Sequence, residues 1–383
     1  MKIIFTVNTY YPLTDGVQAV TEYEAEGLAK LGHDVTVITV RYPGLKELET
    51  FNNVKIIRHN IATKHALFVG DIKGYRKRVE NLCTDADVLI NVCTQTATTE
   101  VLYPLLNKLS CKKILYMHGF HDFHWHMFDL SSISNFGHKL WNNIRWRYDY
   151  IANGRYLKQY DKVIQLHEMD EANLFMQKKF GIYSEIFNNG ADDQFFDFGV
   201  NNNPFKKPYA ICVSNYIPRK NQEFILRAFY KSKQRDMLLV LIGSSNTAYS
   251  SKLFKLKQKL DDEYGKRDVK ILCSVPRQKI ADYVKNSSLY LLGSKWEAFP
   301  ISLVEAMAAG KPYLSTDVGI VKYLPGGKIV ENIDDMAFWI DLLMSNKKIA
   351  KTLGNEGRYY AEENFLEDNI VLRLNKLLKE MNL

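Results

Sequence analysis

Residues 289–316, LYLLGSKWEAFPISLVEAMAAGKPYLST, decide the fold that this sequence predicts. The apolar run Leu289–Leu292 is typical of a buried strand. Pro300 suits the first position of a helix, because the N–H that proline lacks would have no partner there. Gly310 suits the left-handed residue beyond that helix, and Pro312 prevents the helix from continuing. The stretch therefore predicts a strand, a loop, a helix and a second strand in succession.

Two glutamates in this stretch suggest its chemistry. Glu297 lies in the loop before the helix, and Glu305 lies about one and a half turns into it. The start of a helix offers unpaired N–H groups and the positive end of the dipole, which suit a phosphate. Carboxylates on either side cannot hold phosphates, but they accept hydrogen bonds from sugar or ribose hydroxyls. The pattern favours a nucleotide-linked sugar, while two solvated surface acids are the alternative on spacing alone.

The string EAFPISLVEAMAAGKP, residues 297–312, resembles the E-x7-E signature of the retaining glycosyltransferases of family 4, of the bacterial surface-polysaccharide type. The resemblance implies that Glu297 contacts the donor sugar and acts in catalysis, and that Glu305 contacts the ribose of the nucleotide. It also implies that the helix start steadies the departing pyrophosphate. The donor-binding residues expected from this stretch are Phe299, Pro300, Ile301 and Glu305.

The resemblance covers nearly the whole chain and implies an α/β fold of the GT-B type. Such a fold has two Rossmann-like domains that face each other across a deep cleft, with C-terminal helices that cross back to the first domain. A chain of 383 residues with 46% hydrophobic residues suits two domains with separate cores. The expected parts are an acceptor-binding domain at 1–196, a linker at 197–208, a nucleotide-sugar-binding domain at 209–363, and a C-terminal helix at 364–383 that packs on the first domain.

The composition limits the cellular location and the binding partners that we expect for this protein. The five cysteines are scattered without a C-x-x-C pair, so the sequence indicates neither a disulfide framework nor a zinc site. The first apolar run is too short for a signal peptide, and no stretch of about 18 apolar residues predicts a membrane span. We therefore expect a cytoplasmic protein, peripheral at the inner face of the plasma membrane if it binds lipid. The net charge of +8 favours polyanionic partners, whether nucleic acid, anionic lipid or phosphorylated substrates.

The first β-α-β unit contains a glycine of interest. Residues 2–8, KIIFTVN, predict a strand, and Gly16 stands at the mouth of the following helix. A glycine there lets backbone N–H groups approach a phosphate, although an ordinary turn glycine is an equal alternative. No G-x-G-x-x-G dinucleotide fingerprint is present. The unit looks like the family's first β-α-β unit, which implies that Gly16 lies near the donor phosphates.

His118 follows a predicted strand at residues 113–117, at the edge of the sheet where open α/β proteins bind ligands. A structural hydrogen-bonding histidine is the common alternative. His118 with Gly119 resembles an element of the same family, which implies a catalytic contact near the reacting carbon of the donor sugar. His121, His124 and His126 follow, but a metal site is not expected, and a loop that lines the acceptor site is favoured.

The second domain contains the expected anion-binding loops. Lys220 matches a lysine that holds the donor pyrophosphate in the family, but Asn215 stands where the family has an arginine. Asparagine donates a hydrogen bond without a charge, so Arg219 is the candidate that compensates. The loop after the next strand begins at Gly243, and the resemblance implies that this loop lies on the phosphate side. Residues 275–281, which begin with Val275, correspond to the segment that lies near the nucleobase in the family.

Residues 137–162 combine basic residues with tryptophan and tyrosine. This composition suits a membrane interface, where aromatic rings lie at headgroup depth and cations meet anionic lipid. The same composition suits single-stranded nucleic acid, and a helix that buries its aromatic residues is the remaining alternative. We expect an anionic membrane surface to contact this segment and expect no nucleic acid partner.

The expected activity is transfer of a sugar, with retention, from a nucleotide donor to a hydroxyl of a glycan or lipid-linked glycan, in cell-surface polysaccharide biosynthesis. A UDP-sugar is the commonest donor by resemblance. No cofactor and no metal are expected, because lysine and backbone N–H groups replace the metal. Two alternatives remain: a sugar-nucleotide epimerase of the same shape, and a non-catalytic member that acts as a partner or glycan-binding subunit.

Overall fold

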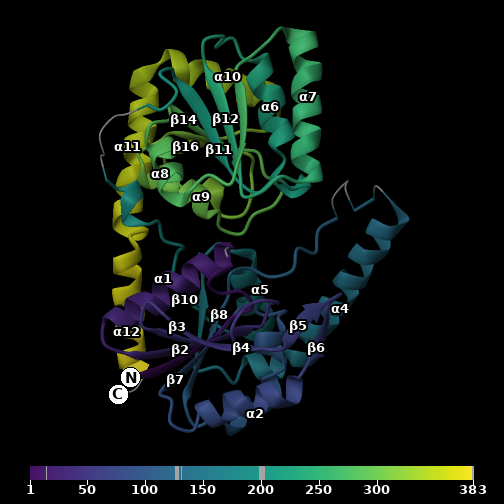
Figure 1. Ribbon diagram of the computed structural model, residues 1–383, viewed down its shortest axis with the longest axis vertical. Coiled ribbons are helices and arrows are strands. Elements are labelled where there is room, and N and C mark those ends of the chain that lie inside the picture. The colour runs from purple at the N-terminus through teal and green to yellow at the C-terminus, as the bar shows by residue number, and fades with distance from the viewer. Residues whose placement is uncertain (14, 126–128, 131, 198–202, 382–383) are drawn as a thin grey trace. The chain divides into compact units, whose positions relative to one another are not determined.

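A computed structural model of the chain describes residues 1–13, 15–125, 129–130, 132–197 and 203–381. Contacts between Cα atoms divide the chain into two compact parts. Unit 1 consists of Met1–Asn188 together with Ile370–Leu383, and unit 2 consists of Asn189–Asn369. Each unit has its own sheet and its own core (Figure 1).

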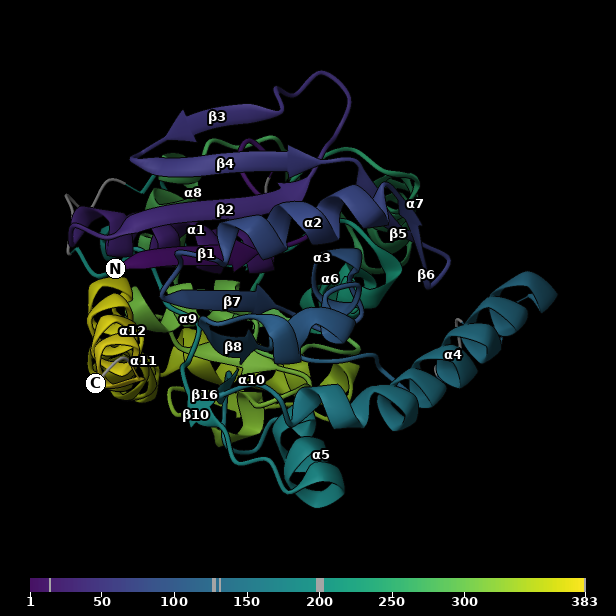
Figure 2. The ribbon, with the colours of Figure 1, turned by 90° about the horizontal axis from the view of Figure 1, so that it is seen from below.

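Within the described residues, unit 1 contains a sheet of eight strands in the order β10-β9-β8-β7-β1-β2-β4-β3. The strand pairs are parallel except for β3 with β4. The central strands consist of continuous apolar runs because helices cover both faces of a parallel sheet. Figure 2 shows α2 in front of β1 and β2, on one face of this sheet. The strands of this sheet are β1 (Lys2–Thr6), β2 (Asp34–Val40), β3 (Leu48–Phe51), β4 (Val54–His59), β7 (Val88–Val92), β8 (Lys112–Tyr116), β9 (Lys162–Gln165) and β10 (Glu185–Ile186).

The helices of unit 1 connect these strands, and a separate hairpin precedes α2. The long helix α4 extends away from the sheet in both ribbon views (Figures 1 and 2). The helices are α1 (Gly16–Lys30), α2 (Ile72–Leu82), α3 (Ala97–Glu100), the 3₁₀ helix η1 (Tyr103–Lys108), α4 (Ile133–Leu157) and α5 (Glu171–Phe180), and the hairpin strands are β5 (Ile61–Lys64) and β6 (Leu67–Gly70).

The hairpin β5–β6 was not predicted, and its turn explains why. His65 and Ala66 have positive φ angles of 49° and 59°. Tight hairpin turns of this kind normally contain asparagine, aspartate or glycine, which tolerate a positive φ. The sequence therefore carries none of the usual residues that identify such a turn.

Within the described residues, unit 2 contains a parallel sheet of six strands in the order β13-β12-β11-β14-β15-β16. Its core lies between this sheet and α6, α7 and α10. The strands are β11 (Tyr209–Val213), β12 (Leu238–Gly243), β13 (Val269–Cys273), β14 (Leu289–Leu292), β15 (Tyr313–Ser315) and β16 (Gly327–Ile329). The helices are α6 (Gln222–Lys231), α7 (Ala248–Tyr264), α8 (Arg277–Lys285), α9 (Ile301–Ala308), α10 (Ile333–Ser345) and α11 (Lys347–Asn364), with the 3₁₀ helices η2 (Asp193–Phe195), η3 (Pro218–Lys220) and η4 (Val321–Tyr323).

The last helix, α12 (Glu367–Met381), begins in unit 2 and continues in unit 1. Val371 packs against Gly27 of α1, where a Cβ atom would lie 2.7 Å from the valine methyl groups. His33 Nε2 and Asn375 Oδ1 are 2.8 Å apart. The predicted return of the C-terminal helix to the first domain is therefore confirmed, as are the two Rossmann-like sheets.

The division into units falls at Asn188/Asn189 and at Asn369/Ile370, compared with the expected boundaries at 196 and 364. Residues 198–202 of the expected linker lie outside the described residues. The linker role of 197–208 stays a prediction, as does the cleft. No helix in the described part of the chain combines the length and the apolarity that a membrane span requires.

Candidate functional site

The order of the strands in unit 2 identifies one place where the loops diverge. Strand β11 lies between β12, which follows it in sequence, and β14, which comes after the chain has returned from the far edge of the sheet. The loops that leave β11 and β14 therefore run in opposite directions from neighbouring strand ends. Open α/β sheets bind ligands at such a switch point, at the carboxyl ends of the strands.

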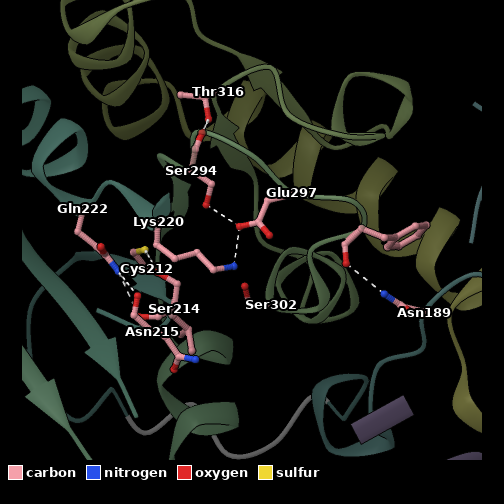
Figure 3. Close-up of polar contacts among 12 residues, drawn as sticks. Asn189, Cys212, Ser214, Asn215, Lys220, Gln222, Ser294, Glu297, Ser302 and Thr316 are labelled. Carbon is pink, nitrogen blue, oxygen red and sulfur yellow. Dashed lines mark hydrogen bonds and ion pairs between the residues drawn. The ribbon is translucent and has the colours of Figure 1, made fainter. Parts of the chain in front are cut away.

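Lys220 and Glu297 come from these two loops and meet there (Figure 3). Lys220 Nζ lies 2.6 Å from Glu297 Oε1, and Ser294 Oγ donates a hydrogen bond of 2.6 Å to the same carboxylate oxygen. Thr316 Oγ1 in turn donates to the Ser294 carbonyl at 2.6 Å. Exposed fractions of 18% for the lysine side chain and 8% for the glutamate show that the pair is largely shielded from water. The reading of Glu297 as a solvated loop acid was wrong.

Further contacts tie the two loops together. The Lys295 N–H donates to the Arg219 carbonyl at 2.8 Å, and Asn221 Nδ2 donates to the Gly293 carbonyl at 3.0 Å. The Arg219 guanidinium lies 5.1 Å from the centre of the Trp296 ring, a favourable cation–π distance. Arg219 is exposed and so carries its charge at the surface beside the pair. Its expected role as a compensating cation stays a prediction.

Asn215 is exposed, and a buried side chain donates a hydrogen bond to its backbone carbonyl. The buried Gln222 side chain donates through Nε2 to the Asn215 carbonyl at 3.1 Å and to Ser214 Oγ at 2.8 Å. Gln222 is the first residue of α6, so the helix start holds the loop that follows β11. Sequence reasoning did not identify Gln222, because a single glutamine at a helix start is a weak signal.

A glycine from a third loop supports the Glu297 backbone. Gly319 has a positive φ of 53°, and a Cβ atom there would lie 2.5 Å from the Glu297 carbonyl oxygen and 2.3 Å from that of Ala298. The Ile320 N–H donates to the Ala298 carbonyl at 3.3 Å. Gly319 therefore allows a close approach between backbones that a larger residue would prevent.

Helix α9 starts one residue later than predicted. Pro300 has extended backbone angles and stands immediately before the first helical residue, Ile301, so its placement at the first helical position was wrong. Gly310 has a φ of 66°, which confirms the predicted left-handed residue beyond the helix. The Phe299 ring packs against Phe365 with centroids 5.8 Å apart, so its side chain is part of the hydrophobic packing of unit 2.

Glu305 is almost fully buried, with 2% of its side chain exposed, and is paired with Arg277 of α8. Burial raises the pKa of the Glu305 carboxyl, and the Arg277 charge acts in the opposite direction. The Arg277 guanidinium also lies 5.0 Å from the centre of the Phe195 ring. The reading of Glu305 as a surface acid was therefore wrong. Arg277 lies within residues 275–281, the segment expected near the nucleobase, but sequence reasoning did not identify it individually.

A further acid lies in the same electrostatic environment. Burial, with the Asp192 charge as a smaller cause, raises the pKa of the Glu367 carboxyl to about 8, although Arg277 acts to lower it. Arg277 is thus influenced by several acids, of which Glu305 is the one in direct contact. The arginine therefore offsets part of the negative charge in this region of unit 2.

Of the two remaining residues predicted in unit 2, Gly243 has a packing role that the structure explains. Gly243 ends β12, and a Cβ atom there would lie 2.4 Å from the Tyr216 ring. Tyr216 is fixed in turn, because its hydroxyl donates to the Leu241 and Leu272 carbonyls at 2.8 and 2.9 Å. Val275 is half-buried between β13 and α8. Their contacts with a donor stay predictions.

Unit 1 contains the other predicted residues, Gly16 and His118. Gly16 is the exposed first residue of α1, where the Asp15 carboxylate accepts a hydrogen bond of 2.8 Å from the Gln18 N–H. His118 follows β8, and its ring stacks on Tyr116 with centroids 4.8 Å apart. Burial lowers the pKa of His118 to about 4, so the imidazole is neutral near pH 7. Its Nε2 atom is buried and has no hydrogen-bond partner among the described residues.

The histidines after His118 make separate contacts. His121 Nε2 lies 2.7 Å from Asn143 Oδ1, and His124 Nδ1 lies 3.2 Å from Asp122 Oδ1. His126 lies outside the described residues. In the part of the chain that the structure describes, no three histidine, cysteine or acidic residues are grouped as metal ligands.

Comparison with known proteins agrees with this architecture. Residues 193–359 match the family described as glycosyl transferases group 1, and residues 14–192 match the one described as glycosyltransferase family 4. An uncharacterised glycosyltransferase of Methanocaldococcus jannaschii is 23% identical, with coverage of 100% of this chain and 99% of its own.

Solved structures are similar over almost the full length. Sucrose-phosphate synthase from Thermosynechococcus elongatus has a TM-score of 0.78 at 16% identity, covering 99% of this chain and 98% of that one. Anabaena HepE in complex with UDP-glucose has a TM-score of 0.70 at 14% identity, covering 99% and 100%. The two family matches adjoin, and together they extend from residue 14 to 359. The chain is therefore a glycosyltransferase of the GT-B fold, in which a group 1 domain follows a family 4 domain.

Proposed function

We propose that this glycosyltransferase moves a sugar from a nucleotide-sugar donor, a UDP-sugar, to a hydroxyl of a glycan or lipid-linked glycan, with retention at the anomeric carbon. The proposed setting is cell-surface polysaccharide biosynthesis. The proposal is supported by the residues at the switch point of unit 2 and by the likeness to HepE, which was solved with UDP-glucose. The observation that carries it is the contact of Lys220 and Ser294 with one oxygen of Glu297.

In this proposal the donor pyrophosphate competes with Glu297 for Lys220. Without donor, the Lys220 ammonium and the Glu297 carboxylate neutralise each other at 2.6 Å. A pyrophosphate beside the start of α9 offers the ammonium a stronger partner, because it is more highly charged and the helix end attracts anions. Lys220 then moves to the phosphate, and the Glu297 oxygen becomes available to a sugar hydroxyl. Ser294 keeps the carboxylate in place during this exchange.

Glu305 is proposed to bind the ribose. A buried carboxylate with one charged partner keeps acceptor positions for hydroxyl donors. Arg277 would share that carboxylate with the ribose, and its half-exposed guanidinium lies close enough to the surface to contact the nucleotide. This sharing makes Arg277 a positioning residue for Glu305.

The chemistry requires no protein nucleophile in this proposal. The departing phosphate oxygen takes the proton of the incoming hydroxyl on the face from which it leaves, so the configuration is retained. The chain positions both partners and stabilises charge: Lys220 and the α9 N–H groups stabilise the leaving pyrophosphate, and Glu297 orients the sugar. His118, neutral near pH 7, would donate or accept a hydrogen bond without changing its charge. No cofactor or metal is part of the proposed mechanism.

The test is to incubate the protein with UDP-sugars and glycan acceptors and to determine the anomeric configuration of the product by NMR. We expect an axial donor to give an axial product. An inverted product would contradict retention. Formation of an isomerised sugar nucleotide without acceptor would instead identify an epimerase. Glu297→Gln is expected to lower kcat, while Glu305→Gln mainly weakens donor binding; full activity in both variants would contradict the assigned site.

A further inference from the structure

Helix α4 carries apolar side chains along its outer side. Apart from the adjacent pair Leu140 and Trp141, they recur every three or four residues, which places them on one face of the helix. Their exposed fractions range from 39% for Leu140 to 93% for Ile133. We call this face the α4 stripe; it consists of Ile133, Phe136, Leu140, Trp141, Ile144, Tyr148 and Ile151.

The opposite face of α4 anchors the helix in unit 1. Trp146, Tyr150 and Leu157 are buried, with Tyr150 and Leu157 in a core cluster. Lys139 is buried as well, and its ammonium donates to the Asp122 carbonyl at 2.6 Å. Packing of the buried face against the core determines which side of α4 faces outward. The α4 stripe lies on the outward side and is available to bind a partner.

Neighbouring segments extend the apolar surface. Trp125 is 43% exposed, and its ring stacks on Phe136 with centroids 5.1 Å apart. Trp141 Nε1 donates to the His65 carbonyl at 3.1 Å, in the turn of the hairpin β5–β6. Leu67 of that hairpin is 51% exposed. An apolar patch built from several segments is larger than the scattered hydrophobic residues of an ordinary surface.

The charges beside the stripe have one sign. The sequence of α4 contains a single acid, Asp149, which is buried and paired with Arg145 at 2.8 Å. Arg147 and Arg155 are exposed, and Lys158 follows directly after the helix with an exposed side chain. The exposed side of α4 therefore combines apolar residues, tryptophan and tyrosine with cations, and it lacks an acid.

We propose that the α4 stripe binds the surface of an anionic lipid bilayer, with the helix lying in the interface. Apolar side chains would enter the boundary of the acyl chains, Trp141 and Tyr148 would lie at headgroup depth, and the cations would contact lipid phosphates. A second copy of the chain fits this face less well, because pairing two α4 stripes would bring cations together without acids to neutralise them.

This inference deepens the proposed function, on which it rests for the class of acceptor: a transferase docked in this way acts on a lipid-linked glycan. Docking is nevertheless measured with the full chain alone, without donor or acceptor. Failure of docking and failure of sugar transfer are therefore observed separately.

The experiment is co-sedimentation of the full-length protein with vesicles of phosphatidylcholine and with vesicles of phosphatidylcholine mixed with phosphatidylglycerol. We expect binding to the anionic vesicles that falls with added salt. Ile144→Glu should lower the partition coefficient about tenfold or more, because a charge replaces a buried apolar side chain. Arg147→Gln should lower it about fivefold, since each cation near an anionic surface contributes about that factor.

Phe338→Glu is the matched control, because Phe338 of α10 has the same exposed fraction of 59% as Ile144. It should bind vesicles as the unchanged chain does, and thermal melting should show that all variants are folded. Emission from Trp141 should shift to shorter wavelength on binding. Equal partition of Ile144→Glu and Phe338→Glu, or no binding of the unchanged chain to anionic vesicles, would overturn the proposal. A dimer in sedimentation velocity that only Ile144→Glu dissociates, without vesicle binding, would assign the face to self-association.

Discussion

At the scale of residues, the site consists of acids that are held by cations rather than exposed to water. Glu297 is held by Lys220 and Glu305 by Arg277, and both carboxylates are buried. The sequence could predict the two glutamates because the motif contains them at a fixed spacing. It could not predict Arg277, because that residue comes from a separate helix and meets Glu305 only through tertiary packing.

Asn215 stands where the family has an arginine, so we predict that an arginine at this position strengthens donor binding. Asn215 is exposed beside the Lys220 loop, so Asn215→Arg can extend a guanidinium without displacing the core. If the donor pyrophosphate binds there, a charge-assisted hydrogen bond should strengthen UDP binding about tenfold. Isothermal titration calorimetry measures this. Asn355→Arg, at an exposed position of α11, is the control and should leave the affinity unchanged; equal affinities for both variants would show that Asn215 does not face the phosphates.

Glu367 gives a prediction about pH. Its pKa is raised to about 8 in the folded chain, so folding retains a proton that the unfolded chain has lost. The free energy of unfolding therefore falls as pH rises from about 4.5 to about 8, and the penalty is complete above that range. Glu367→Gln should raise stability by about 1–2 kcal/mol near pH 9, allowing for screening, and the gain should vanish near pH 4.

Denaturant unfolding at both pH values checks the Glu367 prediction. Asp368→Asn changes the exposed neighbour and should leave the pH dependence as it is. A gain for Glu367→Gln that is the same at both pH values would contradict the proposed titration.

At the scale of elements, strands were easier to predict than turns. Parallel strands such as β11 and β14 are continuous apolar runs, because both faces of their sheet are covered. Helix α7 was not predicted, although Thr247 and Ser250 form a capping box at its start. The hairpin β5–β6 could not be predicted, since its turn lacks the usual residues.

The Gly319 turn gives a prediction at this scale. Gly319→Ala should place a methyl group against the Glu297 and Ala298 carbonyls and shift the loop after β14. Donor affinity should fall by roughly tenfold or more, because a shift near 1 Å misplaces the carboxylate. Gly181→Ala is the matched control, since Gly181 also has a left-handed φ, of 67°, but no atom lies within 4 Å of its added Cβ.

Both alanine variants carry the backbone cost of a left-handed φ, about 1–2 kcal/mol. Gly319→Ala adds the clash with two carbonyl oxygens, so its melting temperature should fall further than that of the control. At a temperature where both variants are folded, donor affinity and transfer rate should fall only for Gly319→Ala. Equal loss of transfer in the two variants would show that the Gly319 effect arises from stability alone.

At the scale of the whole molecule, two α/β units and a returning C-terminal helix follow from the sequence. The apolar runs and glycine positions predict the β-α-β units, and the amphipathic pattern of α12 predicts a helix that packs by one face. Contact of that helix with unit 1 depends on Gly27, where only a glycine admits Val371. The outward orientation of the α4 stripe could not be predicted, because its composition suits buried and exposed aromatic residues equally.

The central claim is that a donor diphosphate binds at Lys220, and titration of UDP into the full chain tests it most directly. Lys257→Met is the control, because Lys257 of α7 also pairs with an acid at 2.6 Å in unit 2, with a similar exposed fraction. Lys220→Met should weaken UDP binding by about 10-fold to 100-fold, because the variant loses a hydrogen bond between charged groups. Lys257→Met should bind UDP as the unchanged chain does. Unaltered UDP affinity in a folded Lys220→Met variant would contradict the account.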